Sequence, residues 1–459
     1  MQNKTYEGLK EELLEMLEHK QIKSFKDTIG ELNEYDIAAL ISELPRRRIA
    51  MVFRLLPKAI SAAVFSYLEL EQQSHIIACI TDRELGEIIE ELFLDDAVDL
   101  LEELPANMVK RVMRTATSET RNLINQYLEY PENSAGSIMT AEFVDLKRHM
   151  TVREAFTRIR RIGEDKETIY TCFVVSSDRQ LQGVVTVRDM LLSDEDAVIG
   201  DIMDTNVIFV TTTEDQEEVT DRFSEYDLLA IPVVDKENRL VGIVTVDDVI
   251  DVLQEEATED FDKMAGITPT DKPYSRAGVI DIWKSRIPWL MFLMLSATFT
   301  GLIIRHFEDA LAACVVLTGF IPMLMDTGGN SGAQSSTAVI RSLSLGDVET
   351  KDILSITWKE FRVAALSAVC LAIINFAKMF LVDKLLLGST DITIFVAFTV
   401  SITLMGTVIF AKLVGCTLPI FAEKIGIDPA VMASPVITTI TDAVSLLIYF
   451  TTASAVLGI

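Results

Sequence analysis

The stretch ITTITDAVSLLIYF, residues 437–450, decides the fold class of this chain. It lies within a run from Ala430 to Ile459 in which Asp442 is the only charged residue. An α-helix needs about 20 apolar residues to cross the hydrocarbon core of a bilayer. The stretch therefore predicts a membrane-spanning helix. Because a carboxylate in the middle of such a helix is costly, it also predicts that Asp442 has a function.

Four more apolar runs precede this one, so we expect a pore domain of five helical spans over residues 284–459. The runs are Ile287–Ile304, Ala310–Met325 continued by Thr327–Ile340, Val363–Ala377 and Ile392–Ala411. The 341–362 connection carries four Lys or Arg residues, and basic loops stay on the cytosolic side. We expect a multi-pass protein of the plasma (inner) membrane, with its N-terminal half in the cytosol and its C-terminus outside.

Charge is divided unevenly along the chain. The net charge is −28, yet residues 285–459, with 10 Lys and Arg against 12 Asp and Glu, contribute only −2 of it. The acidic remainder should attract cations and repel nucleic acid. An acidic soluble surface with no special role is the alternative interpretation. The five cysteines are scattered, which argues against a thiolate metal site.

Residues 1–132 predict an acidic, all-α N domain. Apolar residues recur at helical spacing, as in Ile37, Leu40 and Leu44. Proline suits the first turn of a helix, and Leu-Pro pairs occur at 44–45, 56–57 and 104–105. Short helices at this rhythm predict a right-angled stack or a solenoid.

An internal repeat predicts two α/β units, at 133–196 and 197–255. GSIMTAEFVDL from Gly136 matches GDIMDTNVIFV from Gly200, and the copies end on GVVTVRD and GIVTVDD. The repeat resembles a tandem CBS pair. That resemblance implies an adenine nucleotide whose ribose is held by a Thr and an Asp, which are Thr186 with Asp189 and Thr245 with Asp248. A module that only dimerises is an equal alternative.

An acidic helix is expected over 247–267, DDVIDVLQEEATEDFDKMAGI, and GITPTDKP should end it. It would connect the repeat to the first span.

The candidate ion ligands in the membrane half are oxygen atoms. Ser434 and Thr438 precede Asp442 at helical spacing. Carboxylate and hydroxyl oxygens suit hard cations such as Mg²⁺ or Ca²⁺ better than Zn²⁺ or Cu⁺. A single carboxylate per helix suits an Mg²⁺ ion that keeps its waters. In the alternative interpretation, Asp442 is buried and paired with Lys378 or Lys412.

A second polar segment, FIPMLMDTGGNSGAQSSTAVIRSL, covers residues 320–343. Its glycines and small polar residues predict a close-packed helix face. Such a face is a packing seam, and it can also line a pore.

The whole chain resembles the MgtE family of magnesium channels. PMLMDTGGNSGAQSST and GIDPAVMASPVITTITDAVSLLIYF carry the resemblance. It implies a homodimer in the lipid membrane, with the pore on the two-fold axis and a connecting plug helix within 247–272 that closes it. Asp442 matches the pore aspartate of the family, whereas Ser434 stands where we expect Asn or Gly.

The resemblance also implies regulatory Mg²⁺ sites outside the membrane. The matching acids of the second CBS unit and the plug helix are Asp215, Glu217, Asp227, Asp248, Glu256, Glu259 and Asp260. Candidates for their partners in the N domain are Asp95, Asp96 and Asp99. ATP is implied at Tyr170, Arg188 and Asp189, although Leu228 replaces an aromatic residue that could stack on adenine.

We therefore expect an Mg²⁺-selective channel or transporter that imports magnesium and is gated by cytosolic Mg²⁺. The chain has neither a GxxxxGK[ST] phosphate loop nor an evident nucleophile with its base, so neither an enzyme nor an ATP-driven pump is expected. Two alternatives are a transporter of Co²⁺ or Mn²⁺, and a membrane-anchored nucleotide sensor that conducts no ion.

Overall fold

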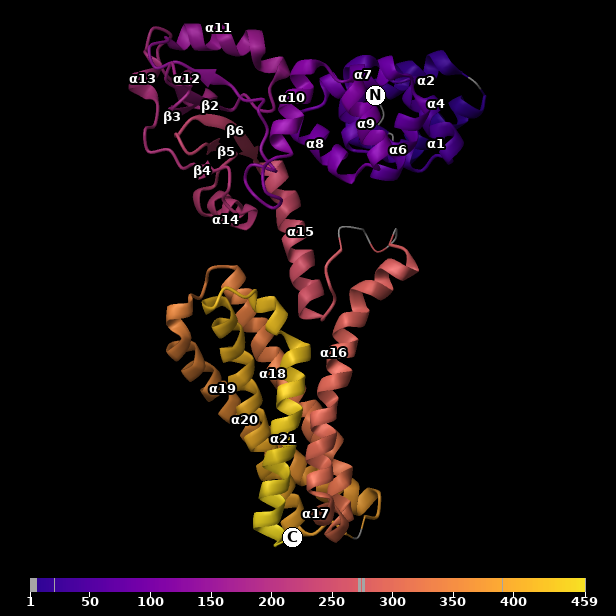
Figure 1. Cartoon of the computed structure of the whole chain (residues 1–459), viewed down its shortest axis with the longest axis vertical. Coiled ribbons are helices and arrows are strands. Elements are labelled where there is room, and N and C mark those ends of the chain that lie inside the picture. The colour runs from indigo at the N-terminus through magenta and orange to yellow at the C-terminus, as the bar shows by residue number, and fades with distance from the viewer. Residues whose placement is uncertain (1–5, 20, 271–273, 275–276, 390, 459) are drawn as a thin grey trace. The chain divides into compact units, whose positions relative to one another are not determined.

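The computed structural model describes residues 6–458 except 20, 271–273, 275–276 and 390. It divides into two compact units, the first ending at Leu253 and the second beginning at Gln254 (Figure 1). Each unit is described by itself. The last two residues of the expected plug segment, 271 and 272, lie outside the described residues.

The first unit opens with an all-α domain, as the sequence predicted. Ten helices follow one another: α1 Tyr6–Glu18, α2 Ile22–Ile29, α3 Glu34–Ser42, α4 Arg46–Phe53, α5 Lys58–Ser66, α6 Leu70–Cys79, α7 Asp82–Glu91, α8 Leu94–Glu103, α9 Ala106–Thr115 and α10 Ser118–Tyr127. Helices two apart in sequence pack together, as α3 does with α5, α5 with α7 and α7 with α9. This alternation is typical of a solenoid.

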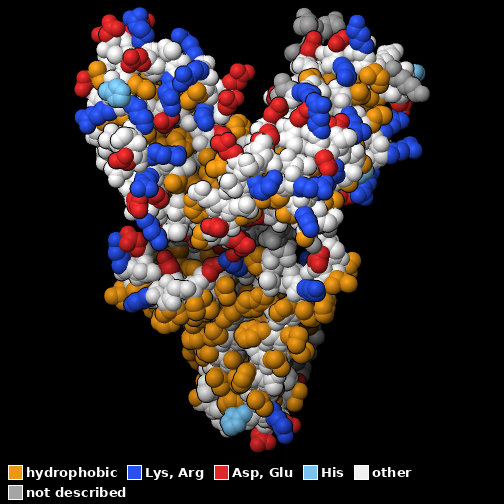
Figure 2. All heavy atoms as spheres, turned by 45° about the horizontal axis from the view of Figure 1, so that its top comes forward, with side chains coloured by type: hydrophobic (Ala, Val, Ile, Leu, Met, Phe, Trp, Pro, Cys, Tyr) orange, Lys and Arg blue, Asp and Glu red, His pale blue; other side chains and the backbone are white. Residues whose placement is uncertain are grey.

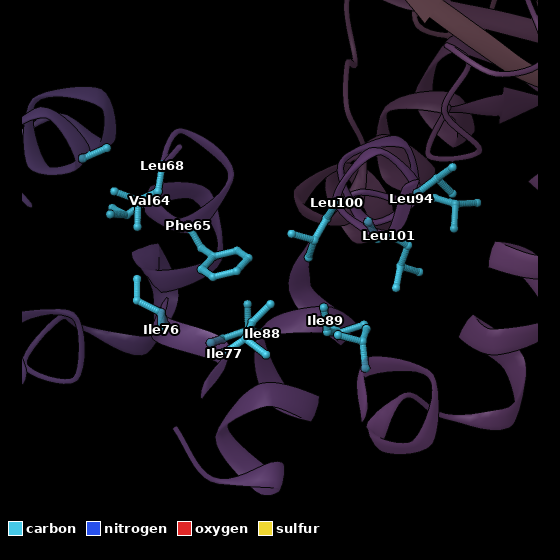
Figure 3. Packing of buried hydrophobic residues seen from close by; sticks show 14 of the residues in the cluster. Val64, Phe65, Leu68, Ile76, Ile77, Ile88, Ile89, Leu94, Leu100 and Leu101 are labelled. Carbon is cyan, nitrogen blue, oxygen red and sulfur yellow. The ribbon is translucent and has the colours of Figure 1, made fainter. Parts of the chain in front are cut away.

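The core of this domain is a continuous set of aliphatic side chains. Figure 3 shows Phe65 of α5 pointing toward Ile77 of α6 and Ile88 of α7, all of them buried. Leu94 and Leu101 of α8 belong to the same cluster. The helices are too short to be stable alone in water, so this shared burial holds them together.

The prolines of the Leu-Pro pairs stand directly before helices. Pro45, Pro57 and Pro105 take the N-cap positions of α4, α5 and α9, with φ between −55° and −58°. They lie one residue earlier than the first helical position that the sequence suggested. Their fixed φ presets the backbone for the turn that follows.

The repeat folds into two three-stranded sheets of equal topology. The first sheet has the order β1 Asp145–Leu146, β2 Thr171–Val175, β3 Leu181–Thr186, and the second β4 Val210–Thr211, β5 Ala230–Val234, β6 Leu240–Thr245. In each, the first pair is parallel and the second antiparallel, with Phe173 opposite Val184 and Pro232 opposite Ile243. The helices between and after them are α11 Val152–Ile162, the 3₁₀ turn η1 Gly163–Asp165, α12 Val187–Leu192, α13 Ile199–Ile202, α14 Gln216–Tyr226 and α15 Val246–Met264.

The two copies exchange the segments that carry the repeat motif. Thr140 of the first copy bridges to Ile243 of the second, and Asp204 bridges to Val184. A Cβ atom at Gly242 would lie 2.7 Å from the Met139 sulfur, and one at Gly183 would lie 2.7 Å from the Met203 sulfur. Glycine is therefore required in GVVTV and GIVTV, because each strand lies directly under the methionine of the other copy.

The acidic helix is somewhat shorter than the sequence predicted. Helix α15 ends at Met264 and not at residue 267. Gly266 has φ +69°, and Ile267 donates a backbone hydrogen bond to Asp262. A left-handed glycine that closes the last turn is the usual end of a helix, so the break falls just before GITPTDKP.

The second unit is a bundle of long helices. Its elements are α16 Val279–His306, α17 Glu308–Ala313, η2 Val315–Phe320, α18 Ile321–Ser344, η3 Thr350–Asp352, α19 Ile353–Lys378, the π-helix η4 Met379–Leu386, α20 Ile394–Lys424, η5 Pro429–Met432 and α21 Ser434–Leu457. Helix α20 packs against α18, α19 and α21, and α18 also packs against α21 (Figure 1).

The second apolar run differs from its prediction. Residues 308–320 form the short α17 and η2, and the long helix α18 begins only at Ile321. Pro322 stands in the first turn of α18, where its missing N–H costs nothing. Asp326 lies inside this helix and does not interrupt it.

Four helical segments among the described residues are long and apolar enough to cross a membrane. They are Val279–His306, Thr350–Leu386, Ile394–Lys424 and Pro429–Leu457. Helix α18, with 24 residues, is also long enough at about 36 Å but is more polar. Hydrophobic side chains cover much of the face of this unit that Figure 2 shows. Exposed hydrophobic residues of α16 include Leu295 and Phe299. A surface of this kind suits lipid.

Candidate functional site

A cavity of about 480 Å³ lies between α18 and α21 in the second unit. Its polar lining consists of Asp326 and Asn330 from α18 with Thr438 and Asp442 from α21. Its apolar lining is Ile321, Pro322, Met325 and Gly329. Oxygen atoms and one amide thus face a space between two membrane helices.

Asp442 lies on this cavity, and the described residues supply no cation that pairs with it. Its Oδ1 is buried and accepts no hydrogen bond among the described residues, and none of them forms an ion pair with it. Lys378 pairs instead with Asp383 at 3.0 Å, and the Lys412 Nζ lies 3.4 Å from the Ser335 hydroxyl. Neither lysine therefore neutralises Asp442, and the alternative interpretation is wrong.

The two hydroxyl residues near Asp442 have different positions. Thr438 lines the cavity, and its hydroxyl donates to the Ser434 backbone carbonyl at 2.6 Å. Ser434 is the first residue of α21 and does not line the cavity. The Thr438 oxygen keeps a free lone pair, so it can still accept a hydrogen bond from a water molecule of a hydrated ion.

The predicted close-packed face of α18 exists. A Cβ atom at Gly329 would lie 2.9 Å from the Thr438 methyl group. Helices α18 and α21 can approach so closely only because this position has no side chain. The seam therefore holds the two cavity walls together.

Sequence reasoning did not assign the cavity residues of α18. Asp326 and Asn330 are one helical turn apart, and the Asn330 Nδ2 donates to the Asp326 Oδ1 at 3.1 Å. The signal in the sequence was a charged residue inside an apolar run, the same signal that singled out Asp442. It went unused because Asp326 was interpreted as a break between two apolar runs.

A group of carboxylates gathers in the first unit, where the start of α8, the start of α15 and the loop before β2 meet. Burial, and then the charge of Asp248, raise the pKa of Asp95 well above its usual range. The same two causes raise the pKa of Asp96 to about 6. Burial raises the pKa of Asp248 to about 6, and burial with Asp247 and Asp248 raises that of Glu167 to about 7.

This acidic cluster (Asp95, Asp96, Glu142, Glu167, Asp247 and Asp248) forms no ion pair among the described residues. The Glu167 Oε2 is buried without a hydrogen-bond partner. Thr245 donates to Asp248 at 2.7 Å, which satisfies only one of the oxygens. Charge repulsion in the cluster is therefore left without compensation from the protein itself.

Three of the implied regulatory acids lie around α14. Asp215 caps the helix by accepting from the Glu217 N–H at 2.9 Å, so these two are neighbours. Asp227 lies at the other end with φ +51°. A helix of 11 residues is about 16 Å long, so Asp227 and the other two cannot share one ion. Asp99 lies one turn after Asp95 in α8 and is exposed.

The end of α15, which belongs to the second unit, contacts the rest of that unit through polar groups. The Lys263 Nζ lies 2.5 Å from an Asp428 oxygen and also pairs with Glu259. Asp260 accepts from the Ser344 hydroxyl at 3.2 Å. Burial, with the charges of Asp428 and Glu259, raises the pKa of Asp260. Glu256, one turn earlier, is half-buried and has interactions of its own.

No group of three or more His, Cys, Asp or Glu side chains in the described part of the chain is arranged to enclose a metal ion. The regulatory acids lie at separate places in the two units: Asp95, Asp96 and Asp248 in the acidic cluster, others around α14, and others at the end of α15. Where they face each other they supply carboxylate oxygens, the ligands that Mg²⁺ prefers.

The residues implied in nucleotide binding lie at the start of α12. Thr186 and Asp189 form a capping box, in which the Thr186 N–H donates to Asp189 at 3.2 Å. Tyr170 and Arg188 are exposed beside them, and the backbone carbonyl of Tyr170 accepts from Val187. In the second copy, Thr245 and Asp248 take the same positions at the start of α15. Asp247, a member of the acidic cluster, stands there in place of Arg188.

The fold and these sites define a class, that of membrane proteins with a long-helix transport unit and a CBS-containing regulatory unit. Three family models match along the chain: an MgtE intracellular N domain at residues 32–133, CBS domains at 135–195 and 199–255, and a divalent cation transporter at 321–452.

Similar proteins extend the match to nearly the full length. A magnesium transporter MgtE of Thermus thermophilus is 37% identical over 98% of this chain and 99% of its own, and one of Bacillus subtilis is 34% identical over 99% of both. The chain belongs to the MgtE family, as its sequence motifs indicated.

Solved structures match the first unit. One, the soluble part of a magnesium transporter, has a TM-score of 0.53 at 33% identity and covers 55% of this chain and all of its own. Another, the cytosolic domain of the Mg²⁺ channel MgtE in complex with ATP, has a TM-score of 0.50 at 39% identity, over 52% of this chain and 98% of its own.

Proposed function

We propose that this chain carries Mg²⁺ across the plasma membrane through the cavity between α18 and α21, and that it transports and does not catalyse a reaction. The observation that carries the proposal is the carboxylate of Asp442 on the wall of that cavity, whose Oδ1 is buried and has no hydrogen-bond partner among the described residues. A carboxylate in a membrane helix without a cationic partner is destabilising unless an ion or water reaches it. The relatives named as magnesium transporters support the choice of ion.

The size of the cavity fits an ion that keeps its first shell of water. Mg²⁺ loses water reluctantly and usually binds proteins through only one or two carboxylates. Six waters occupy roughly 180 Å³ at the density of the liquid. The cavity of about 480 Å³ can therefore hold the hydrated ion, with Asp442 accepting hydrogen bonds from its waters and Thr438 supplying another oxygen.

The membrane arrangement follows from the helices and the basic loop. Four apolar segments and the more polar α18 make five spans, which leave the two ends of the chain on opposite sides. Arg341 at the end of α18, Lys351 in the connection, and Lys359 and Arg362 near the start of α19 favour a cytosolic position for this connection. The first unit is then cytosolic and the C-terminus outside. Two copies in the lipid membrane would close the cavity from its open side, which favours a homodimer.

Gating by cytosolic Mg²⁺ is the regulatory part of the proposal. Among the described residues no cation compensates the acidic cluster of the first unit, so we expect its elements to stay together only when protons or metal ions neutralise it. Further carboxylate ligands would come from the two ends of α14. Asp215 and Glu217 lie at its start, and Asp227 lies at its end. High Mg²⁺ would thus favour a packed, closed state and low Mg²⁺ an open one.

The plug is the second half of α15. Its acids Glu256, Glu259 and Asp260 lie where the helix meets the membrane helices, and Asp428 lies opposite. Bound Mg²⁺ at these carboxylates would hold the helix against α18 and α21. Moving a switch from 1:99 to 99:1 needs about 5.5 kcal/mol of differential binding, which several weak sites can supply together.

Nucleotide binding is proposed at the first CBS copy alone. Asp189 and Arg188 stand at the start of α12, where a ribose and a phosphate could be held, and Tyr170 is exposed beside them. The relative solved in complex with ATP supports nucleotide binding by the cytosolic part, and the choice of the first copy rests on Arg188. In the second copy the acidic cluster would repel phosphate.

The test is Mg²⁺ flux into liposomes that contain the purified full-length protein, followed with an entrapped Mg²⁺ indicator. Asp442→Asn should reduce the flux at least about a hundredfold, which corresponds to about 2.7 kcal/mol. Asp347→Asn, which changes an exposed loop acid of the same unit, is the matched control and should retain the flux. Normal transport by a monodisperse Asp442→Asn protein would refute the assignment, and absence of flux in the unchanged protein would favour a sensor that conducts nothing.

A neighbouring candidate is a carrier of another divalent cation such as Co²⁺ or Mn²⁺, which the family description as a divalent cation transporter allows. Competition by these ions in the same liposomes separates the two candidates.

A further inference from the structure

A second carboxylate faces the cavity from the opposite wall. Asp326 lies in the second turn of α18 and is exposed in the single chain. Among the described residues no cation pairs with it, and its hydrogen bond comes from a neutral amide. Because lipid cannot solvate a carboxylate at this depth, the exposed side of Asp326 must meet water or ions.

Packing places Asp326 close to the level of Asp442. A Cβ atom at Gly328 would lie 2.7 to 3.1 Å from side-chain atoms of α20 and of Thr441 and Ser445 in α21, so these parts of α18 and α21 lie side by side. Asp326 is two residues before Gly328, and Asp442 directly follows Thr441. Both carboxylates line the one cavity.

Asn330 fixes the carboxylate in place. Its Nδ2 donates to the Asp326 Oδ1 at 3.1 Å, which leaves Oδ2 for water or an ion. An amide holds the group without neutralising it, whereas a lysine or arginine at the same place would cancel the charge. The arrangement therefore preserves two negative charges, one held by Asn330 and one with a buried, unpartnered oxygen on Asp442.

We propose that Asp326 is the second ion-facing carboxylate of this pathway and that it determines the preference for divalent over monovalent cations, given the transport function proposed above. A doubly charged ion gains twice as much from each added carboxylate as a singly charged ion does. One carboxylate attracts cations of any charge, while two facing carboxylates favour Mg²⁺ over Na⁺ or K⁺. Rings of acidic side chains select cations in this way in other pores.

The experiment compares five full-length proteins in planar bilayers and liposomes: the unchanged chain, Asp326→Asn, Asp326→Glu, Asn330→Ala and Asp442→Asn. Asp326→Asn should lower the Mg²⁺-over-Na⁺ permeability ratio at least about tenfold, or about 1.4 kcal/mol, and Asp326→Glu should restore most of it. Asn330→Ala should fall between them, because the carboxylate remains but is no longer fixed.

Two results would overturn the inference while leaving the transport function intact. One is a permeability ratio and a Mg²⁺ flux in Asp326→Asn within twofold of the unchanged protein, while Asp442→Asn is inactive. The other is an equal loss in Asp326→Asn and Asp326→Glu, which would mean a packing role. If Asp442→Asn itself transports normally, the proposed function fails, and this is seen independently of position 326.

A covalent modification guards against a variant that does not assemble. Asp326→Cys should react with water-soluble methanethiosulfonates if the position faces an aqueous cavity. A sulfonate-bearing reagent restores the negative charge and should raise the Mg²⁺ preference, whereas an ammonium-bearing reagent should lower it further. The unchanged protein, with its five cysteines, is the control for modification elsewhere. A thiol at position 326 that does not react, or equal effects of the two reagents, would contradict the inference.

Discussion

The Lys263 ammonium lies 2.5 Å from an Asp428 carboxylate oxygen and thereby joins the end of α15 to the loop before α21. The same ammonium pairs with Glu259, and burial, which lowers its pKa, is outweighed by the two carboxylates, which raise it. Lys263 is therefore charged at any physiological pH. A fixed cation is built into the place where the proposed plug meets the membrane helices.

Replacing this cation should change how much Mg²⁺ closes the pathway. In Lys263→Gln, the acids Glu259 and Asp428 lose their fixed partner and need a metal ion instead. Partly exposed ion pairs contribute about 0.2–1 kcal/mol each, so the loss of two pairs should raise the Mg²⁺ needed for half-closure by about two- to thirtyfold. The measurement is current or flux against cytosolic Mg²⁺, with Lys424→Gln, an exposed lysine, as the control. A fall in the required Mg²⁺ would mean that Lys263 competes with the ion.

Neutralising the plug acids together should uncouple closure from Mg²⁺. The triple change Glu256→Gln, Glu259→Gln and Asp260→Asn removes three carboxylates of α15 and leaves its helix propensity almost unchanged. We expect flux that persists at high cytosolic Mg²⁺. Protease cleavage near the end of α15 should be slower in Mg²⁺ than in EDTA for the unchanged protein, with no such difference in the triple variant. Ordinary closure together with ordinary protection would refute the mechanism.

Packing around the acidic cluster should depend on pH when Mg²⁺ is absent. The pKa values of Asp96 and Asp248 are raised to about 6 and that of Glu167 to about 7, so the packed state takes up protons. The stabilisation is complete below the ordinary carboxyl pKa and is lost as the pH rises through 6 and 7. Each pKa unit corresponds to a tenfold change, so hydrogen exchange of α8 in EDTA should accelerate by at least about tenfold between about pH 5 and 7.5, after correction for intrinsic rates.

The control for this pH dependence lies in the same loop. Glu167→Gln should flatten the upper part of the profile, and Glu164→Gln, which changes an exposed neighbour, should not. Millimolar Mg²⁺ should flatten the profile of the unchanged protein, because the ion replaces the protons. A slope that is the same in all three proteins would show that other groups titrate.

The pathway should discriminate against Zn²⁺. The cavity is lined by carboxylate, hydroxyl and amide groups, and among its lining residues there is no thiolate or imidazole. Soft or borderline ions therefore gain little there. In liposomes, Zn²⁺ should inhibit Mg²⁺ flux only weakly, and Thr438→Cys should raise its potency at least about tenfold. Tight inhibition of the unchanged protein from within the membrane would contradict this.

Much of the fold was readable from local patterns. Apolar periodicity indicated the helical N domain, and the GVVTV and GIVTV strands indicated the two CBS units, because each pattern reflects burial within one short element. Helix ends were less accurate: α15 ends three residues early, and α18 begins eleven residues after the start of its apolar run. Burial against neighbours and the position of Pro322 decide those ends, and neither is visible in composition alone.

The sequence by itself determined the segregation of charge from apolar spans, the repeat, and the position of Asp442 in the middle of a span, since each depends only on neighbours along the chain. Only the tertiary structure decided that Asp326 and Asp442 line one cavity, that Glu167 joins the acids of α8 and α15, and that Lys263 pairs with Asp428. Each of these relationships joins residues from different elements. Their energy depends on the distance across packed helices, which side-chain spacing along the chain does not specify.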